Sequence, residues 1–131
     1  MVFVDTGAWY ASLIPTDPDH SAAITWFNQN QEPLITTDFI IDETLTLLRA
    51  RGQKRRAVLV AEAFSAGNLG TIHFLTQPEF QEALEVFRHY ADKEWSFTDC
   101  TSKVVIDKLG LARAFTFDHH FRQFGTVLVV P

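Results

Sequence analysis

Short apolar runs alternate along this chain with longer stretches in which apolar residues recur at helical spacing, and this alternation limits the possible folds more than any other feature. The short runs are rich in β-branched and aromatic residues and are bounded by Gly, Pro or polar clusters, a pattern typical of buried strands. We expect strands over residues 2–5, 34–36, 71–75, 114–117 and 126–130, and helices over residues 7–14, 19–31, 38–51, 53–66, 79–91 and 99–110, with a short helix after Asp118. Because strands and helices alternate along the chain, the sequence predicts an α/β fold with a parallel sheet and helices on both faces.

The composition supports one globular domain over residues 1–131 and excludes several classes of protein. Apolar residues make up 47% of the chain, enough to fill a core, so an intrinsically disordered protein is excluded. The net charge of −5 argues against an indiscriminate nucleic-acid binder, although it is compatible with an acidic pocket that holds cations. The single cysteine, Cys100, excludes an internal disulfide, and no apolar run approaches the roughly 20 residues that span a membrane. We therefore expect a cytoplasmic protein without a signal peptide.

Two acidic residues directly follow predicted strands. Asp5 ends the first strand and Asp118 ends the fourth. In open parallel sheets, functional groups collect beyond the carboxyl ends of the strands, at the point where the strand order reverses. If the order is 3-2-1-4-5, the first and fourth strands flank this point, and both carboxylates face the same crevice. Either residue could also serve only as a helix N-cap, and the sequence leaves that alternative open.

A third acid, Glu43, lies at the edge of the apolar face of the predicted helix 38–51. At about 100° per residue, that face is centred on Ile41, Leu45 and Leu48, whereas Asp42 points to the polar side. A carboxylate beside apolar neighbours costs free energy unless a charge pairs with it, and no basic residue of this helix is placed to do so. Glu43 is therefore the acid of this helix that we expect at a functional site.

A fourth acid, Asp99, begins the last long predicted helix. It could favour the helix dipole, with Thr98 as the cap, or it could join the other acids. Four carboxylates in one crevice repel one another unless a cation is present. Mg²⁺ prefers oxygen ligands, and such a site can activate water against a phosphodiester. His119 and His120 do not predict zinc, because adjacent positions point to different sides and no zinc-ligand spacing is present.

Four stretches of the sequence together resemble the motifs of the PIN-domain family, and within it the VapC-type toxins of toxin–antitoxin pairs. They are Val4-Asp5-Thr6-Gly7-Ala8-Trp9-Tyr10-Ala11, the helix from Asp38 to Leu48, Ser96-Phe97-Thr98-Asp99-Cys100-Thr101-Ser102 and Phe115-Thr116-Phe117-Asp118-His119-His120-Phe121. The resemblance covers essentially the whole chain, and the order and spacing of the stretches make it specific. It implies a five-stranded parallel sheet of order 3-2-1-4-5, dependence on Mg²⁺ or Mn²⁺, and hydrolysis of single-stranded or loop RNA.

The resemblance also implies roles for particular residues and partners. The implied catalytic and metal-binding residues are Asp5, Glu43, Asp99 and Asp118, with Thr6 and Ser102 hydrogen-bonded to the metal-binding carboxylates. Some relatives carry a further acid two residues before the fourth, where this chain has Thr116, so the number of metal ions stays open. A homodimer and a cognate antitoxin that inserts near the active site are implied as well.

Five of the eleven basic residues lie within eight positions: Arg49, Arg51, Lys54, Arg55 and Arg56. They predict either an RNA-backbone patch beside the acidic pocket or an ordinary solvated helix surface, and the sequence does not decide between the two. Four aromatic residues could stack on bases, although aromatic residues more often fill cores or interfaces: Trp9, Tyr10, Trp26 and Phe27.

We interpret the chain as a metal-dependent endoribonuclease, and two alternatives can be compared with it. A phosphatase with an aspartyl nucleophile would need a second acid two positions after Asp5, where this chain has Gly7. A non-catalytic PIN-like or receiver-like protein-binding module would bind a partner without turnover. Such a module does not require Glu43 at the edge of the core.

Overall fold

The computed structural model describes all of residues 1–131 and contains one five-stranded sheet with the order β3-β2-β1-β4-β5. The strands are β1 (Val2–Val4), β2 (Leu34–Thr37), β3 (Thr71–His73), β4 (Arg113–Phe115) and β5 (Leu128–Val130). Every neighbouring pair is parallel, with Val4 opposite Phe115 in the central pairing. The predicted fold class and strand order are therefore confirmed. Four of the five strands are shorter than expected, because residues such as Asp5 and Phe117 lie in the connections that follow, whereas β2 is one residue longer than expected.

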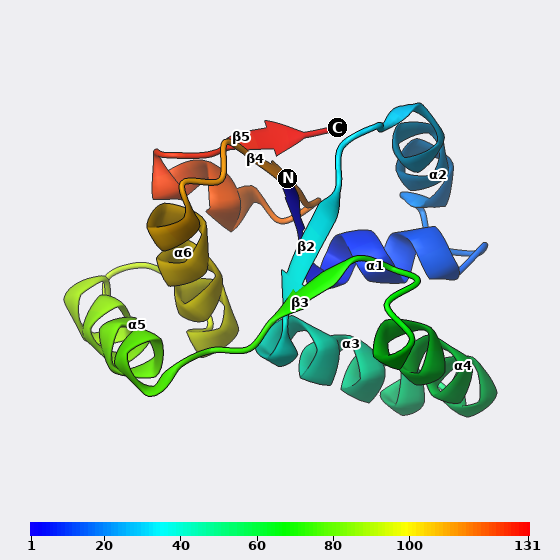
Figure 1. Cartoon of the computed structure of the whole chain (residues 1–131), viewed down its shortest axis with the longest axis horizontal. Helices are drawn as coiled ribbons and strands as arrows, with labels where there is room; N and C mark the ends of the chain where they lie inside the picture. Colours follow the sequence, from blue (N-terminus) through cyan, green and yellow to red (C-terminus); the bar gives the residue numbers. More distant parts are fainter.

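Six α-helices and one 3₁₀ helix connect and cover the strands (Figure 1). They are α1 (Thr6–Leu13), α2 (His20–Gln29), α3 (Asp38–Ala50), α4 (Lys54–Ser65), α5 (Gln77–His89), α6 (Phe97–Leu109) and the 3₁₀ helix η1 (His119–Phe124). Helices α5, α6 and η1 lie on one side of the sheet, and α1, α2 and α4 lie on the other. None of the helices is long and apolar enough to cross a membrane.

Local sequence signals fix where the last two α-helices begin and end. Thr76 and Glu79 form a capping box at the start of α5, with Pro78 in the first turn. Ser96 and Asp99 form a second capping box, so α6 begins two residues earlier than expected, and Thr98 is not its cap. Gly110 ends α6 in the left-handed conformation, as its position predicted.

The hydrophobic core is built around the central strand β1. The aromatic residues for which we expected core or interface packing lie in this core or pack against it. All of β1 is buried, and Trp9 and Tyr10 of α1 are buried beside it. Trp26 stacks on Phe115 with ring centroids 4.2 Å apart. These aromatic rings therefore stabilise the fold, and they are not free to stack on a substrate base.

Helix α3 corrects one expectation about its buried face. The fully buried positions are Ile40, Thr44 and Leu48, whereas Ile41 and Leu45 are half-buried. The Thr44 hydroxyl donates to the Ile40 carbonyl at 2.7 Å, so a polar side chain can occupy the centre of this face. Because α3 contacts α1, α4 and α6, its covered surface is broader than one stripe. Glu43 still lies at the edge of that surface, and Asp42 is exposed, as predicted.

Candidate functional site

The structure brings the four predicted acids together at the carboxyl ends of the central strands. They line one pocket of about 340 Å³, whose wall comes from the start of α1, the middle of α3, the start of α6 and the turn after β4. The full lining is Asp5, Thr6, Gly7, Glu43, Leu47, Glu94, Ser96, Asp99, Asp118 and His120. It contains no lysine or arginine, so the pocket carries a concentrated negative charge.

Asp5 is the most buried of the four acids, with 5% of its surface exposed. It occupies the N-cap position of α1, but its side chain makes no capping hydrogen bond, so capping does not account for it. Its Oδ2 accepts a hydrogen bond from the Thr116 hydroxyl at 2.9 Å. Burial raises the pKa of Asp5 to about 7, and the negative charges of Asp99 and Asp118 add to the rise, while the Thr116 hydrogen bond opposes it.

Thr116 connects Asp5 to the fourth acid. Its hydroxyl oxygen accepts a hydrogen bond from the Asp118 backbone N–H at 2.9 Å while it donates to Asp5. Asp118 Oδ1 in turn accepts from the His120 N–H at 2.9 Å and caps η1. The Thr116 hydroxyl therefore sets the relative position of two carboxylates.

Asp99 both caps the start of α6 and lines the acidic pocket. Its Oδ2 accepts from the Ser96 N–H at 3.0 Å, and the Ser96 hydroxyl accepts from the Asp99 N–H at 3.0 Å. This capping box fixes the side chain while the residue still lines the pocket. Burial raises the pKa of Asp99, as does the charge of Asp118, and the Ser96 N–H opposes the change.

Two further acids complete the pocket at its rim. Glu43 is half-buried and has no ion-pair partner, which agrees with the absence of a suitable basic residue in its helix. Glu94 was not predicted as a site residue. It lies in the loop before α6, beside Asp92 and Lys93, and this short charged run looks like ordinary surface in the sequence.

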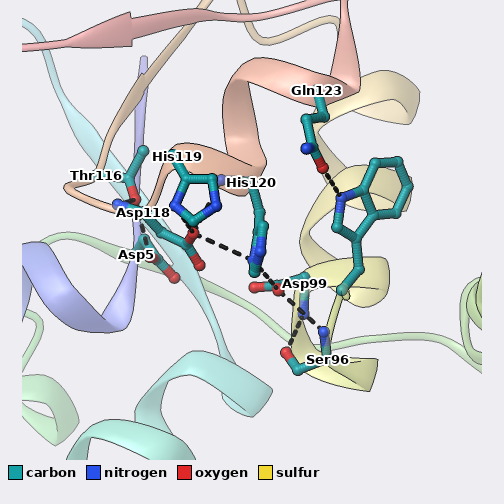
Figure 2. Close-up of polar contacts among 9 residues, drawn as sticks. Asp5, Ser96, Asp99, Thr116, Asp118, His119, His120 and Gln123 are labelled. Atoms are coloured by element: carbon teal, nitrogen blue, oxygen red, sulfur yellow. Dashed lines mark hydrogen bonds and ion pairs between the residues drawn. The ribbon is translucent and has the colours of Figure 1, made fainter. Parts of the chain in front are cut away.

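His120 is the second pocket residue that the sequence analysis missed. Its Nδ1 lies 3.2 Å from Asp118 Oδ1 and 3.5 Å from Asp99 Oδ2 (Figure 2). The rings of His119 and His120 lie beside each other, with centroids 4.3 Å apart, but only His120 lines the acidic pocket, so the two adjacent histidines face different sites. The two rings and Asp118 place their potential ligand atoms within 4.8 Å of one another. The tight turn of η1 produces this arrangement, and the sequence alone did not indicate it.

Three buried polar groups in and near the pocket make no hydrogen bond, and they bear on whether a metal ion would fit. The hydroxyls of Thr6 and Ser102 and the Nδ1 of His120 are buried without a hydrogen bond, so the predicted bonds from Thr6 and Ser102 to the acids are not formed. Buried polar groups are normally paired. A set of carboxylates with unpaired oxygen donors nearby fits a hard divalent cation.

The five predicted RNA-binding residues divide into two groups. The Arg56 guanidinium donates to the Leu13 carbonyl, and the Arg51 guanidinium lies 4.8 Å from the centroid of the Tyr10 ring. Both arginines therefore connect the α3–α4 corner to α1. The remaining three, Arg49, Lys54 and Arg55, are exposed and form no ion pair.

A second hollow adjoins the acidic pocket and shares Asp118 with it. Its volume is about 230 Å³, and its lining includes the cationic or potentially cationic side chains of Arg122 and His119. The two hollows thus differ in charge although they meet at one residue. Arg122 is not one of the residues that the sequence analysis singled out.

Comparison with known proteins identifies the family. Residues 2–127 match the PIN domain. The chain is also 32% identical over 131 residues to the 23S rRNA-specific endonuclease VapC20 of Mycobacterium tuberculosis, covering 100% of this chain and 99% of that protein. This chain is a PIN-domain protein of the VapC type. A VapC ribonuclease of Archaeoglobus fulgidus is 30% identical to this PIN domain over 123 residues, with coverage of 90% and 77%.

Solved structures agree with the family. The crystal structure of M. tuberculosis VapC20, described as a sarcin–ricin loop cleaving toxin, superimposes on this PIN domain with a TM-score of 0.92, 31% identity and full coverage of both chains. FitAcB from Neisseria gonorrhoeae superimposes with a TM-score of 0.72 at 15% identity, covering 100% of this chain and 97% of the other. That second likeness shows the shared fold alone.

Proposed function

We propose that this PIN domain is a metal-dependent endoribonuclease, the toxin of a toxin–antitoxin pair, and that it cleaves the sarcin–ricin loop of 23S ribosomal RNA in the cytoplasm. The observation that carries the proposal is the gathering of Asp5, Glu43, Asp99 and Asp118 in one pocket that contains no lysine or arginine. The full-length similarity to VapC20 supports both the activity and the target.

The four acids would hold Mg²⁺ or Mn²⁺. When bound, a divalent ion lowers the pKa of water and stabilises the charge that develops on a phosphodiester. Asp5 fits the centre of such a site, because a buried carboxylate whose pKa is raised to about 7 gains most from a nearby cation. Thr116 keeps Asp5 and Asp118 in a fixed relation and so acts as a positioning residue.

The cationic groups near the pocket suggest how the RNA backbone lies. Arg122 and His119 line the hollow next to Asp118, where a phosphate that flanks the cleaved bond can be neutralised. The free cations Arg49, Lys54 and Arg55 would contribute longer-range attraction. These groups offset the net charge of −5 where the substrate approaches.

The proposed function includes two protein partners. A cognate antitoxin would block the pocket, as expected for a VapC-type toxin. A homodimer is supported by a cluster of phenylalanines on α3, α5 and α6 that reaches the surface: Phe39, Phe80, Phe87 and Phe97. Phe87 is 49% exposed, and exposed aromatic clusters are typical of protein interfaces. Light scattering of purified protein measures the oligomeric state directly.

Cleavage of a short RNA hairpin that carries the sarcin–ricin loop tests the proposed function. The control RNA has the same stem and a scrambled loop, and each is incubated with Mg²⁺, Mn²⁺ or EDTA. We expect one metal-dependent cut within the native loop, no cut in the scrambled loop, and loss of cleavage in Asp5→Asn. Folded protein that cuts neither the hairpin nor total ribosomal RNA with either metal would instead support the non-catalytic binding module.

A further inference from the structure

His120 is the only side chain of the acidic pocket that offers a nitrogen ligand, and it lies between two carboxylates. Its Nδ1 is 3.2 Å from Asp118 Oδ1 and 3.5 Å from Asp99 Oδ2. The same nitrogen is buried and makes no hydrogen bond, although both oxygens are acceptors within reach. His120 Nδ1 therefore lies close to both carboxylates without the geometry of a hydrogen bond to either.

These separations match those between ligands that share one cation. When metal–ligand bonds are about 2.1 Å long, neighbouring ligands of an octahedral ion lie about 3 Å apart. The two distances from His120 Nδ1 are close to this edge length. Figure 2 shows the ring edge of His120 directed at both carboxylates, which come from α6 and from the turn after β4.

A second group in the same pocket also lacks a partner. The Thr6 hydroxyl is buried without a hydrogen bond in a residue that is 6% exposed and lines the pocket. Two unpaired buried polar groups on different elements, α1 and η1, border the same pocket. A bound ion and its water ligands would satisfy both of them.

We propose that His120 Nδ1 is a direct ligand of the divalent ion, together with Asp99 and Asp118, and that this nitrogen makes the pocket favour Mn²⁺ over Mg²⁺. The inference rests on the proposed function in so far as both need an ion in this pocket. Mg²⁺ strongly prefers oxygen ligands, whereas first-row transition ions also accept imidazole nitrogen. One imidazole among carboxylates therefore raises the affinity for Mn²⁺ more than the affinity for Mg²⁺.

His119 provides a matched control, because it has the same side chain at the next position. Its side chain is 78% exposed, its Nδ1 is 4.0 Å from Asp118 Oδ1, and it does not line the acidic pocket. Replacement of His119 removes an imidazole from the same turn, but not the imidazole that lines the acidic pocket.

The test is electron paramagnetic resonance of Mn²⁺ added to the full-length protein. Electron spin echo modulation should show ¹⁴N coupling to bound Mn²⁺ in the wild type and in His119→Asn, and the coupling should disappear in His120→Asn. Titration of the free Mn²⁺ signal, with Mg²⁺ as competitor, gives both affinities. We expect His120→Asn to weaken Mn²⁺ binding about 10-fold, and Mg²⁺ binding clearly less.

Bound Mn²⁺ without ¹⁴N coupling in the wild-type protein would overturn the proposal, and this measurement needs no variant. Equal weakening of Mn²⁺ and Mg²⁺ binding in His120→Asn would also overturn it, because His120 would then only position the carboxylates. Cleavage of the RNA hairpin is scored separately. Metal-dependent cleavage without ¹⁴N coupling would leave the proposed function standing while it removes this inference.

Discussion

Two buried carboxylates in this protein have opposite properties. Asp5 lies at the carboxyl end of β1 with one hydroxyl donor and two acidic neighbours, and its pKa is raised to about 7. Glu79 lies in the first turn of α5 with a side chain that is 1% exposed, and its pKa is lowered to about 2. Burial by itself would raise both values, so the difference comes from the partners.

The partners of Glu79 come from three elements. Its carboxylate accepts from the Thr76 N–H at 2.8 Å and from His73 Nε2 at 3.0 Å, and Lys108 Nζ of α6 lies 3.7 Å away. The hydrogen bonds outweigh the cost of burial and connect α5 to β3, and the ion pair with Lys108 connects it to α6. The comparison teaches that a buried acid with its full set of donors stabilises the fold, whereas a buried acid that lacks them indicates a site for an ion.

The largest expected difference between the two acids is in catalysis. Asp5→Asn should lower the rate of hairpin cleavage by about 100-fold to 1,000-fold, because it removes a charge from the reacting centre. Glu79→Gln should leave the rate of the folded protein within about twofold. Single-turnover cleavage at saturating Mg²⁺ measures the rates of both variants. A similar loss of rate in the two variants would contradict the claim that, of these two acids, only Asp5 belongs to the ion site.

In the metal-free protein, Asp5 and Glu79 should change the free energy of unfolding with pH in opposite directions. Asp5 keeps a proton in the folded state that it releases in the unfolded state, so its contribution is complete below pH 3.8 and is lost as the pH rises to about 7. Relative to Asp5→Asn, the wild type should lose stability on the order of 4 kcal/mol across this window. The contribution of Glu79 is instead lost as the pH falls from 4.5 to about 2.

Urea denaturation in EDTA at a series of pH values measures these contributions. Asp5→Asn should unfold at higher urea than the wild type at pH 8, and the two proteins should converge near pH 4. Parallel curves across that range would show that Asp5 is ionised freely in the folded protein, contrary to the comparison.

Removal of the Glu79 charge should destabilise the protein near neutral pH. Glu79→Gln leaves His73 and Lys108 without their carboxylate, and we expect a loss of about 2 kcal/mol in the free energy of unfolding. Glu82→Gln is the control, because Glu82 is exposed on the same helix and should change stability by less than about 0.5 kcal/mol. Equal urea midpoints for the two variants would show that the Glu79 contacts contribute nothing net.

The smallest effects are expected in the basic cluster. Lys54→Ala and Arg55→Ala should each weaken RNA binding only a few-fold and reduce its salt dependence, because both side chains are exposed and unpaired. Arg56→Ala should mainly lower stability, because the Arg56 guanidinium bonds to the Leu13 carbonyl. Fluorescence anisotropy at several salt concentrations, beside thermal melts, separates binding from folding.

The alternation of strands and helices and the four acids of the pocket could be proposed from short, local signals, whereas the strand order came from the resemblance to the PIN-domain family. Asp5 and Asp118 directly follow buried strands, and the carboxyl ends of parallel strands meet at one edge of the sheet. The position of Glu43 at the edge of the buried face could be predicted from the helical spacing of the apolar residues of α3. The cap of α6 was predicted wrongly as Thr98, although the Ser96-x-x-Asp99 spacing of a capping box is present in the sequence.

The other site features depend on contacts that sequence spacing does not encode. Thr116 joins Asp5 across 111 positions, and Glu79 meets Lys108 across an interface between two helices. His120 reaches the pocket because η1 is a 3₁₀ turn, in which side chains do not follow the α-helical angle. Periodicity identifies faces of regular elements, so it cannot place side chains in such turns or in the loop of Glu94.

Anomalous diffraction at the manganese edge, from crystals of the metal-free protein soaked in Mn²⁺, tests the central claim most directly. We expect an anomalous peak in the acidic pocket within bonding distance of Asp5, Asp99 or Asp118, and no peak beside Glu79. A structure at several millimolar Mn²⁺ with no peak in the pocket, in a crystal form that leaves it open, would contradict the claim that these unneutralised carboxylates form an ion site.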